Sequence, residues 1–181
     1  LNMRILIKNK GEKIMQKKYS GMEYEEVVKL FADDITKMCV IWTHDIEAAK
    51  DCFQNTFLKL YQTNKEFSNE KHIKSWLLRV AKNECNDYHR LFWNKNVDLR
   101  EDIEQNFSET FNCDDETKEL VYALQKLPLK YSCVITFYYY EGYKTAEIAK
   151  ILGCSQNTVK SRLRRGRKYL ADIMHDAEEL L

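Results

Sequence analysis

A run of cations without acids marks the C-terminal third of the chain. Seven Lys or Arg residues and no acid lie between Glu147 and Asp172. Like charges at helical spacing repel one another, so a helix that faces only solvent usually mixes both signs. A helix that keeps this repulsion is typical of a surface that binds a polyanion such as DNA. The acid-free run therefore predicts contact with nucleic acid.

Two short amphipathic segments hold these cations. Residues 145–152 and 156–170 are predicted helices, separated by a Gly-Cys-Ser break. Gly153 can adopt the positive φ that a tight turn needs, and Ser155 can cap the second helix. This pattern predicts a helix-turn-helix whose second helix enters the DNA major groove.

A helical wheel divides the second segment into two faces. Val159, Leu163, Gly166 and Leu170 share one face, which we expect to point inward. Two arginines flank this apolar face, where phosphates are nearer than base edges. The residues predicted to bind DNA are Asn157, Lys160, Ser161, Arg162, Arg164, Arg165, Arg167 and Lys168.

Composition limits the remaining alternatives. The 181 residues include 29 basic and 28 acidic side chains, so the basic surface is local. One Pro and five Gly favour an all-α fold over a loop-rich β fold. The six cysteines lack zinc-type spacing, so we expect reduced thiols, no metal and no cofactor. No apolar stretch approaches 18 residues, which predicts a cytoplasmic protein without membrane insertion.

An acidic segment divides the chain. Residues 98–119 hold nine acids and two cations, with poor helical periodicity. They are a solvated spacer or a segment that occupies a basic channel of a partner. We expect two small helical domains joined by this linker, the C-terminal one containing the helix-turn-helix. The predicted boundaries are a flexible arm at 1–22, a helical domain at 23–94, the linker at 95–116 and the second domain at 117–178.

Three helical patterns precede the linker, at 24–42, 45–61 and 73–92, and a shorter one follows at 120–127. The segment CVITFYYY at 133–140 has the propensity of a strand. It has no partner strand, and Gly142 follows where a helix would end. We therefore expect a helix there, stabilised by packing against the later helices.

The second helix of the first domain presents a mixed outer face. Leu58 lies there among acids and amides. A lone exposed leucine is common and needs no explanation. A leucine ringed by polar groups is also typical of a small docking site for a partner protein.

The third helix and the loop before it present a different face, with cations and amides beside aromatic residues. This combination suits an unstacked single strand better than a duplex, because bases can stack and expose their edges. A solvated face with Trp76 in the core is the alternative. The residues predicted to bind a strand are Phe67, Ser68, Asn69, Trp76, Arg79, Lys82, Asn83, Asn86 and Arg90.

These blocks resemble a known family. DIEAAKDCFQNTFLKLY (45–61) and KSWLLRVAKNECNDYHR (74–90) resemble conserved region 2 of bacterial RNA polymerase sigma factors of the extracytoplasmic-function (ECF) type. The segment LQKLPLKYSCVITFYYYEGYKTAEIAKILGCSQNTVKSRLRRGRKYL (124–170) resembles region 4 of the same family. The resemblance covers about residues 24–175. It implies a transcription initiation factor that directs core RNA polymerase to promoters without catalysis of its own.

The resemblance also implies roles for the three faces. The loop at 64–71 and the third helix would open and read the −10 element, and residues 157–168 would bind the −35 duplex. The linker would pass through the RNA exit channel. Region 4 would contact the flap of the second largest polymerase subunit, and the family often has an anti-sigma factor. The residues expected on the clamp helices of the largest subunit are Asp51, Gln54, Asn55, Leu58 and Lys59.

The chain departs from the family pattern at three places. Asn55 replaces the usual acid, which weakens the charge part of the docking interpretation. Lys144 replaces the usual Ser before the helix-turn-helix, so we expect Thr145 to cap one residue late. The resemblance does not explain the N-terminal arm.

Two other classes of protein remain as alternatives. A helix-turn-helix repressor or response-regulator output domain would not need a basic, aromatic face for a single strand. A nuclease or zinc enzyme would need carboxylate clusters or ligand spacing that the sequence lacks.

Overall fold

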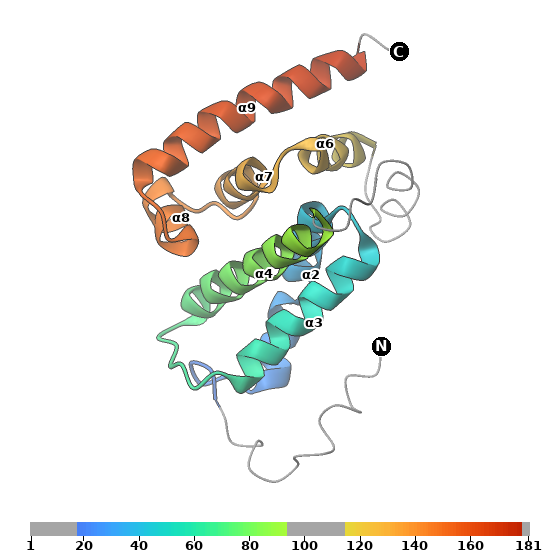
Figure 1. Cartoon of the computed structure of the whole chain (residues 1–181). Coiled ribbons are helices and arrows are strands. Elements are labelled where there is room, and N and C mark those ends of the chain that lie inside the picture. Colours follow the sequence, from blue (N-terminus) through green and yellow to red (C-terminus); the bar gives the residue numbers. More distant parts are fainter. Residues whose placement is uncertain (1–17, 94–114, 179–181) are drawn as a thin grey trace.

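The computed structural model describes residues 18–93 and 115–178, and within these ranges the fold is all-α, as predicted (Figure 1). The first group of helices contains α2 (Tyr24–Thr43), α3 (Ile46–Gln62) and α4 (Glu70–Trp93). Each helix packs against the other two. The predicted helices at 24–42, 45–61 and 73–92 are therefore confirmed, with ends shifted by a few residues.

Local chemistry explains the sharp turn between α2 and α3. His44 ends α2 in the left-handed region, with φ of 61°. Asp45 then caps α3, because its carboxylate accepts a hydrogen bond of 2.9 Å from the backbone N–H of Ala48. The turn directs α3 back along α2, which closes the core around Phe57, Leu77 and Trp42.

The second group of helices contains α6 (Asp115–Lys126), α7 (Leu129–Ile135), the π-helix η2 (Thr136–Tyr140), α8 (Thr145–Leu152) and α9 (Gln156–Glu178). The helical prediction for 133–140 is confirmed, and its second half has the wider π geometry. Phe137 points into the core, whereas the three tyrosines that follow it are exposed. Gly142 follows with φ of 69°, so the turn to α8 uses the left-handed region.

The predicted arm is too long at its C-terminal end. Tyr19 is buried, and its hydroxyl donates a hydrogen bond of 3.0 Å to the carbonyl oxygen of Leu60. Tyr19 and Met22 also form an isolated antiparallel bridge. The core therefore begins inside the segment that the sequence predicted as flexible. Residues 1–17 and most of the predicted linker lie outside the described residues.

The two groups of helices share one hydrophobic core. α2 packs against α6 and α7, and α4 packs against α8, which places the second group directly on the first (Figure 1). Trp42 of α2 and Phe137 of η2, both fully buried, meet edge to face with ring centroids 5.4 Å apart. The side chain of Gln125 donates a hydrogen bond of 3.2 Å to the carbonyl oxygen of Val40.

Five cysteines lie within the described ranges as free thiols, and Cys113 lies outside them. No group of three potential metal ligands occurs among the described residues. Within the same ranges, no helix is both long and apolar enough to cross a membrane.

Candidate nucleic-acid interfaces

The helix-turn-helix at 145–170 has the geometry that the sequence predicts. Gly153 ends α8 with φ of 64°. The Oγ of Ser155 accepts a hydrogen bond of 3.0 Å from the backbone N–H of Thr158, so Ser155 caps α9. The expectation for Thr145 is wrong, because Thr145 is already the first residue of α8. Its hydroxyl accepts a hydrogen bond of 2.8 Å from the side chain of Gln156, which links the two helices instead.

The two faces of α9 are also as predicted. Val159, Leu163 and Gly166 are buried, and Leu170 is half-buried against the core. A Cβ atom placed on Gly166 would lie 2.9 Å from Cδ1 of Ile135, so α9 crosses α7 at close range. Arg162 is half-buried beside the apolar face. The remaining predicted DNA-binding residues are exposed: Asn157, Lys160, Ser161, Arg164, Arg165, Arg167 and Lys168.

The outer face of α4 holds the predicted strand-binding residues of that helix. Asn83, Asn86 and Arg90 are exposed, and Lys82 is half-buried. Trp76 is also half-buried, packed at the border of the core, which combines the two alternatives given for it.

Arg79 has contacts that the sequence did not predict. Its Nε donates a hydrogen bond of 2.8 Å to the carbonyl oxygen of Ile151, and its Nη2 donates a second one to that of Lys150. Both carbonyls belong to the last turn of α8, where helical C=O groups have no partner within the helix. Arg79 thus joins the predicted strand-binding face to the helix-turn-helix.

The loop before α4 differs from the expectation. Phe67 is buried against Tyr19 and Trp76, so the prediction of an exposed aromatic residue at this position is wrong. Asn69 uses its side-chain oxygen to accept a hydrogen bond of 2.8 Å from the backbone N–H of His72, at the start of α4. Ser68 is exposed beside it. The loop therefore presents polar groups, and its aromatic ring anchors it to the core.

A cavity of about 370 Å³ lies where α4 meets α8. Its lining combines basic side chains with two aromatic rings, those of Trp76 and Tyr143. The sequence did not place Lys150 beside Lys65 and Lys71, because it lies far from both along the chain and meets them only in the folded protein. The lining residues are Lys65, Lys71, His72, Ser75, Trp76, Arg79, Tyr143, Glu147, Lys150 and Ile151.

The outer face of α3 is open. Leu58 is 44% exposed, and Asp51 and Asn55 are exposed beside it. Lys59 is exposed and pairs with Glu84 of α4 at 2.5 Å, which fixes α3 against α4. Gln54 is half-buried. These residues form a polar face with an apolar centre on α3 (Figure 1).

The arrangement defines an all-helical protein that has a basic helix-turn-helix on one group of helices and polar faces on the other. Each of the two groups of helices matches a known family model. Residues 27–92 match the family model described as Sigma-70 region 2, and residues 117–170 match that described as Sigma-70, region 4. We use "region 2" and "region 4" for these two segments below.

Curated relatives extend the match along the chain. The ECF RNA polymerase sigma factor SigM of Bacillus subtilis is 29% identical over 154 residues, which are 82% of this chain and 93% of SigM. SigL of Mycobacterium tuberculosis is 32% identical over 126 residues, covering 67% of this chain and 71% of SigL. The chain belongs to the ECF sigma factor family and is a bacterial transcription initiation factor.

Solved structures show the same fold. The sigma factor RpoE of Bartonella quintana, solved in complex with the anti-sigma factor NepR, superposes with a TM-score of 0.66 at 20% identity. That match covers 84% of this chain and 96% of RpoE. CnrH, solved with the cytosolic domain of CnrY, gives a TM-score of 0.58 at 18% identity.

Proposed function

We propose that this sigma factor directs core RNA polymerase to promoters by dividing the work between its two regions. Region 4 binds the −35 element as a duplex, and region 2 melts the −10 element and holds one strand of it. The chain contributes binding and positioning, with no catalysis of its own. The division of charge supports this proposal most directly: cations dominate the exposed face of α9, with no acid between Glu147 and Asp172, whereas the face of α4 mixes cations with the amides Asn83 and Asn86.

The exposed side chains of α9 support binding of the −35 duplex. Ser155 caps the helix at the end that would enter the major groove, and the cations that follow it point to solvent. Bidentate contact of an arginine with guanine is the commonest base-specific contact in this groove. Arg164 and Arg165 have the exposure for that role, whereas the half-buried Arg162 is better placed for a phosphate.

The outer face of α4 supports binding of a single strand. Asn83 and Asn86 are exposed amides that can pair with base edges, and Arg90 is an exposed cation near the end of the helix. Trp76 offers part of a ring at the same face. Phe67 does not belong to this set because it is buried.

The outer face of α3 supports docking on core polymerase. Leu58 forms an apolar centre, and Asp51, Asn55 and Lys59 form a polar rim around it. RpoE was solved with an anti-sigma factor, and a protein of that kind is a further proposed partner of the chain.

Run-off transcription tests the proposal. Purified chain is mixed with core polymerase and a promoter library, and the transcripts are sequenced. We expect initiation from promoters with conserved elements near −35 and −10, and none from core polymerase alone. Absence of any initiated transcript, together with tight binding of palindromic duplexes by the chain alone, would indicate a repressor instead.

A further inference from the structure

A hydrogen bond joins the first residues of the two helices in the helix-turn-helix. Thr145 is the first residue of α8, and Gln156 is the first residue of α9. The Nε2 of Gln156 donates a hydrogen bond of 2.8 Å to the hydroxyl oxygen of Thr145. Both residues belong to region 4, so the bond lies within one region. It fixes the end of a long side chain that has many rotamers when it is unbound.

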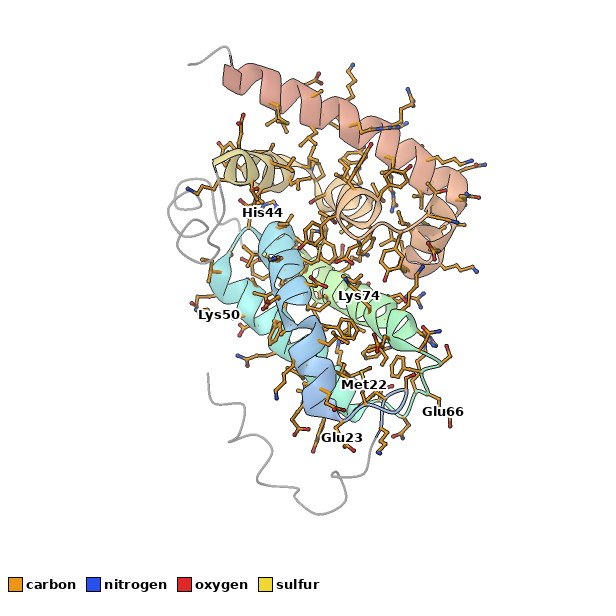
Figure 2. The ribbon with its side chains drawn as sticks, turned by 180° about the vertical axis from the view of Figure 1, so that it is seen from behind. Met22, Glu23, His44, Lys50, Glu66 and Lys74 are labelled. Atoms are coloured by element: carbon orange, nitrogen blue, oxygen red, sulfur yellow. The ribbon has the colours of Figure 1, made fainter. Side chains whose placement is uncertain are left out.

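Gln156 lies at the N-terminal end of α9. In a helix-turn-helix, residues at this end of the second helix contact base edges in the major groove. Gln156 is exposed, and the exposed Lys160 follows one turn later on the same side of α9. Figure 2 shows side chains with nitrogen ends that project from α9 away from the other helices. A duplex that binds these cations therefore meets Gln156 as well.

The hydroxyl groups at this end of α9 are used within the helix itself. The Oγ of Ser155 accepts a hydrogen bond from the backbone N–H of Thr158 and lies 2.8 Å from the Thr158 hydroxyl. The hydroxyl of Ser161 donates to the carbonyl oxygen of Thr158 at 2.9 Å. Asn157 is a second exposed amide, and within the described ranges no hydrogen bond fixes its side chain. Gln156 is therefore the amide at this end whose direction the fold determines.

The atoms that Gln156 keeps available match adenine. A glutamine amide has two N–H donors and an acceptor oxygen. Thr145 takes one donor, so the second N–H and Oε1 remain for a ligand. Adenine presents the complementary pair in the major groove, with the acceptor N7 beside the donor N6. Guanine presents two acceptors at the same edge, so Oε1 would face an acceptor. The amide thus distinguishes adenine from guanine.

We propose that Gln156 reads one adenine of the −35 duplex and that Thr145 is the positioning residue that orients its amide. This inference rests on the proposed function for the identity of the duplex. It adds a base-specific contact to the cations of α9, which attract any duplex by charge. A hydrogen bond between two helices of region 4 thus contributes to the choice of promoter.

Selection from random duplexes tests the role of Gln156. The full chain is incubated with duplexes that have a randomised central segment, and the bound molecules are sequenced. We expect the wild type to enrich adenine about ten-fold at one position, and Gln156→Ala to lose this enrichment while its other preferences remain. An unchanged profile, or a loss at a base other than adenine, overturns the inference alone. A wild type without any base preference would contradict the proposed function as well.

Two substitutions of Thr145 test its positioning role. Thr145→Val keeps the shape of the side chain and removes the acceptor, whereas Thr145→Ser keeps the hydroxyl. We expect the valine variant to lose roughly three-fold or more of the adenine enrichment, at the position that Gln156→Ala affects, and the serine variant to keep it. Added to Gln156→Ala, Thr145→Val should cause no further loss at that position. A purely structural role would weaken all duplexes alike, and that result, or no change, overturns the positioning role.

A carboxylate at position 156 gives a second readout. It has the length of glutamine but only accepts, so it suits the N4 donor of cytosine better than the N7 acceptor of adenine. We expect Gln156→Glu to enrich cytosine in place of adenine at the same position, although the added negative charge lowers total binding. Continued enrichment of adenine would overturn the inference.

The matched control is Gln62→Glu, which makes the same change at the exposed last residue of α3 in region 2. This variant should keep the wild-type profile. A shift from adenine to cytosine in the control as well would mean that charge alone, and not a contact of residue 156, changes the preference. Circular dichroism shows whether each variant keeps its helices.

Discussion

Gly166 of α9 lies directly against Ile135 of α7, so that a Cβ atom on Gly166 would come within 2.9 Å of Cδ1 of Ile135 and 3.3 Å of Cβ of Tyr131. The glycine has an ordinary helical conformation, so it is needed here for its size. This contact sets how closely the recognition helix packs on the rest of region 4.

Substitutions at Gly166 test how closely α9 packs against α7. We expect Gly166→Val to lower the free energy of unfolding by about 1–3 kcal/mol, since the larger side chain has to push α9 away from α7. Gly166→Ala should change it by less than about 1 kcal/mol, because better helix propensity offsets a small shift of Ile135. Urea unfolding followed by circular dichroism gives both values, and equal losses would argue against the crossing described here.

His44 predicts a pH dependence of stability. Burial, with His89 and Lys126 nearby, lowers the pKa of His44 from 6.5 to about 4. Below pH 6.5 the unfolded chain takes up a proton at this residue that the folded chain takes up only near pH 4. The contribution of His44 to the free energy of unfolding is therefore complete above pH 6.5. It falls by a total of about 1–3 kcal/mol as the pH drops towards 4.

His44→Asn isolates this contribution. Asparagine tolerates the left-handed backbone of residue 44 and has no proton to exchange in this range. The variant should lose stability less steeply than the wild type between pH 6.5 and 4, measured as the midpoint of urea unfolding at each pH. Parallel curves for the two proteins would assign the acid sensitivity to other groups.

Substitutions of arginines on different sides of α9 should differ in how strongly their effect on DNA binding depends on the DNA sequence. Arg164→Ala is expected to weaken binding of the −35 duplex by about 1–3 kcal/mol and to alter the preferred base at one position. Arg162→Ala should weaken all duplexes alike and reduce the salt dependence of binding. Fluorescence anisotropy with a set of single-base variants separates the two. Sequence-blind losses for both would mean that α9 meets DNA through another face.

Leu58→Glu tests the docking face of α3. A charge in the centre of the apolar spot should abolish assembly with core polymerase, measured by native gel shift, while binding to the −35 duplex is retained. Leu30→Glu is the matched control, because Leu30 is a similarly exposed leucine on α2, outside that face. If Leu58→Glu still assembles, polymerase binds elsewhere on the chain.

Much of the fold could be predicted from local signals. Gly153 and Ser155 mark helix ends through their own backbone and capping chemistry, and the structure confirms both of them. The phase of α9 followed from the spacing of Val159, Leu163 and Gly166. Leu58 was predicted to be exposed, and it is. All these properties depend on residues within one or two turns.

What could not be predicted depends on contacts between distant residues. Phe67 is a lone aromatic residue in a polar loop, and its burial depends on Tyr19, which lies in the predicted arm. Arg79 is a surface cation on any helical wheel, and only the position of α8 reveals its partners. The edge-to-face contact of Trp42 with Phe137 joins helices that the linker separates. Hydrophobic patterns and helix propensities along the sequence give no information about such pairings between distant residues.

The π-helix η2 controls the angular position of everything that follows it. A π turn holds about one residue more than an α turn, so the backbone after η2 is rotated relative to a continuous α-helix. Glu141 comes directly after this turn and reaches Lys74 only at the resulting angle. Loss of one residue from 136–140 would turn Glu141 by about 100° around the helix axis. The length of one irregular turn thus determines whether the two halves of the molecule can be held together by charge.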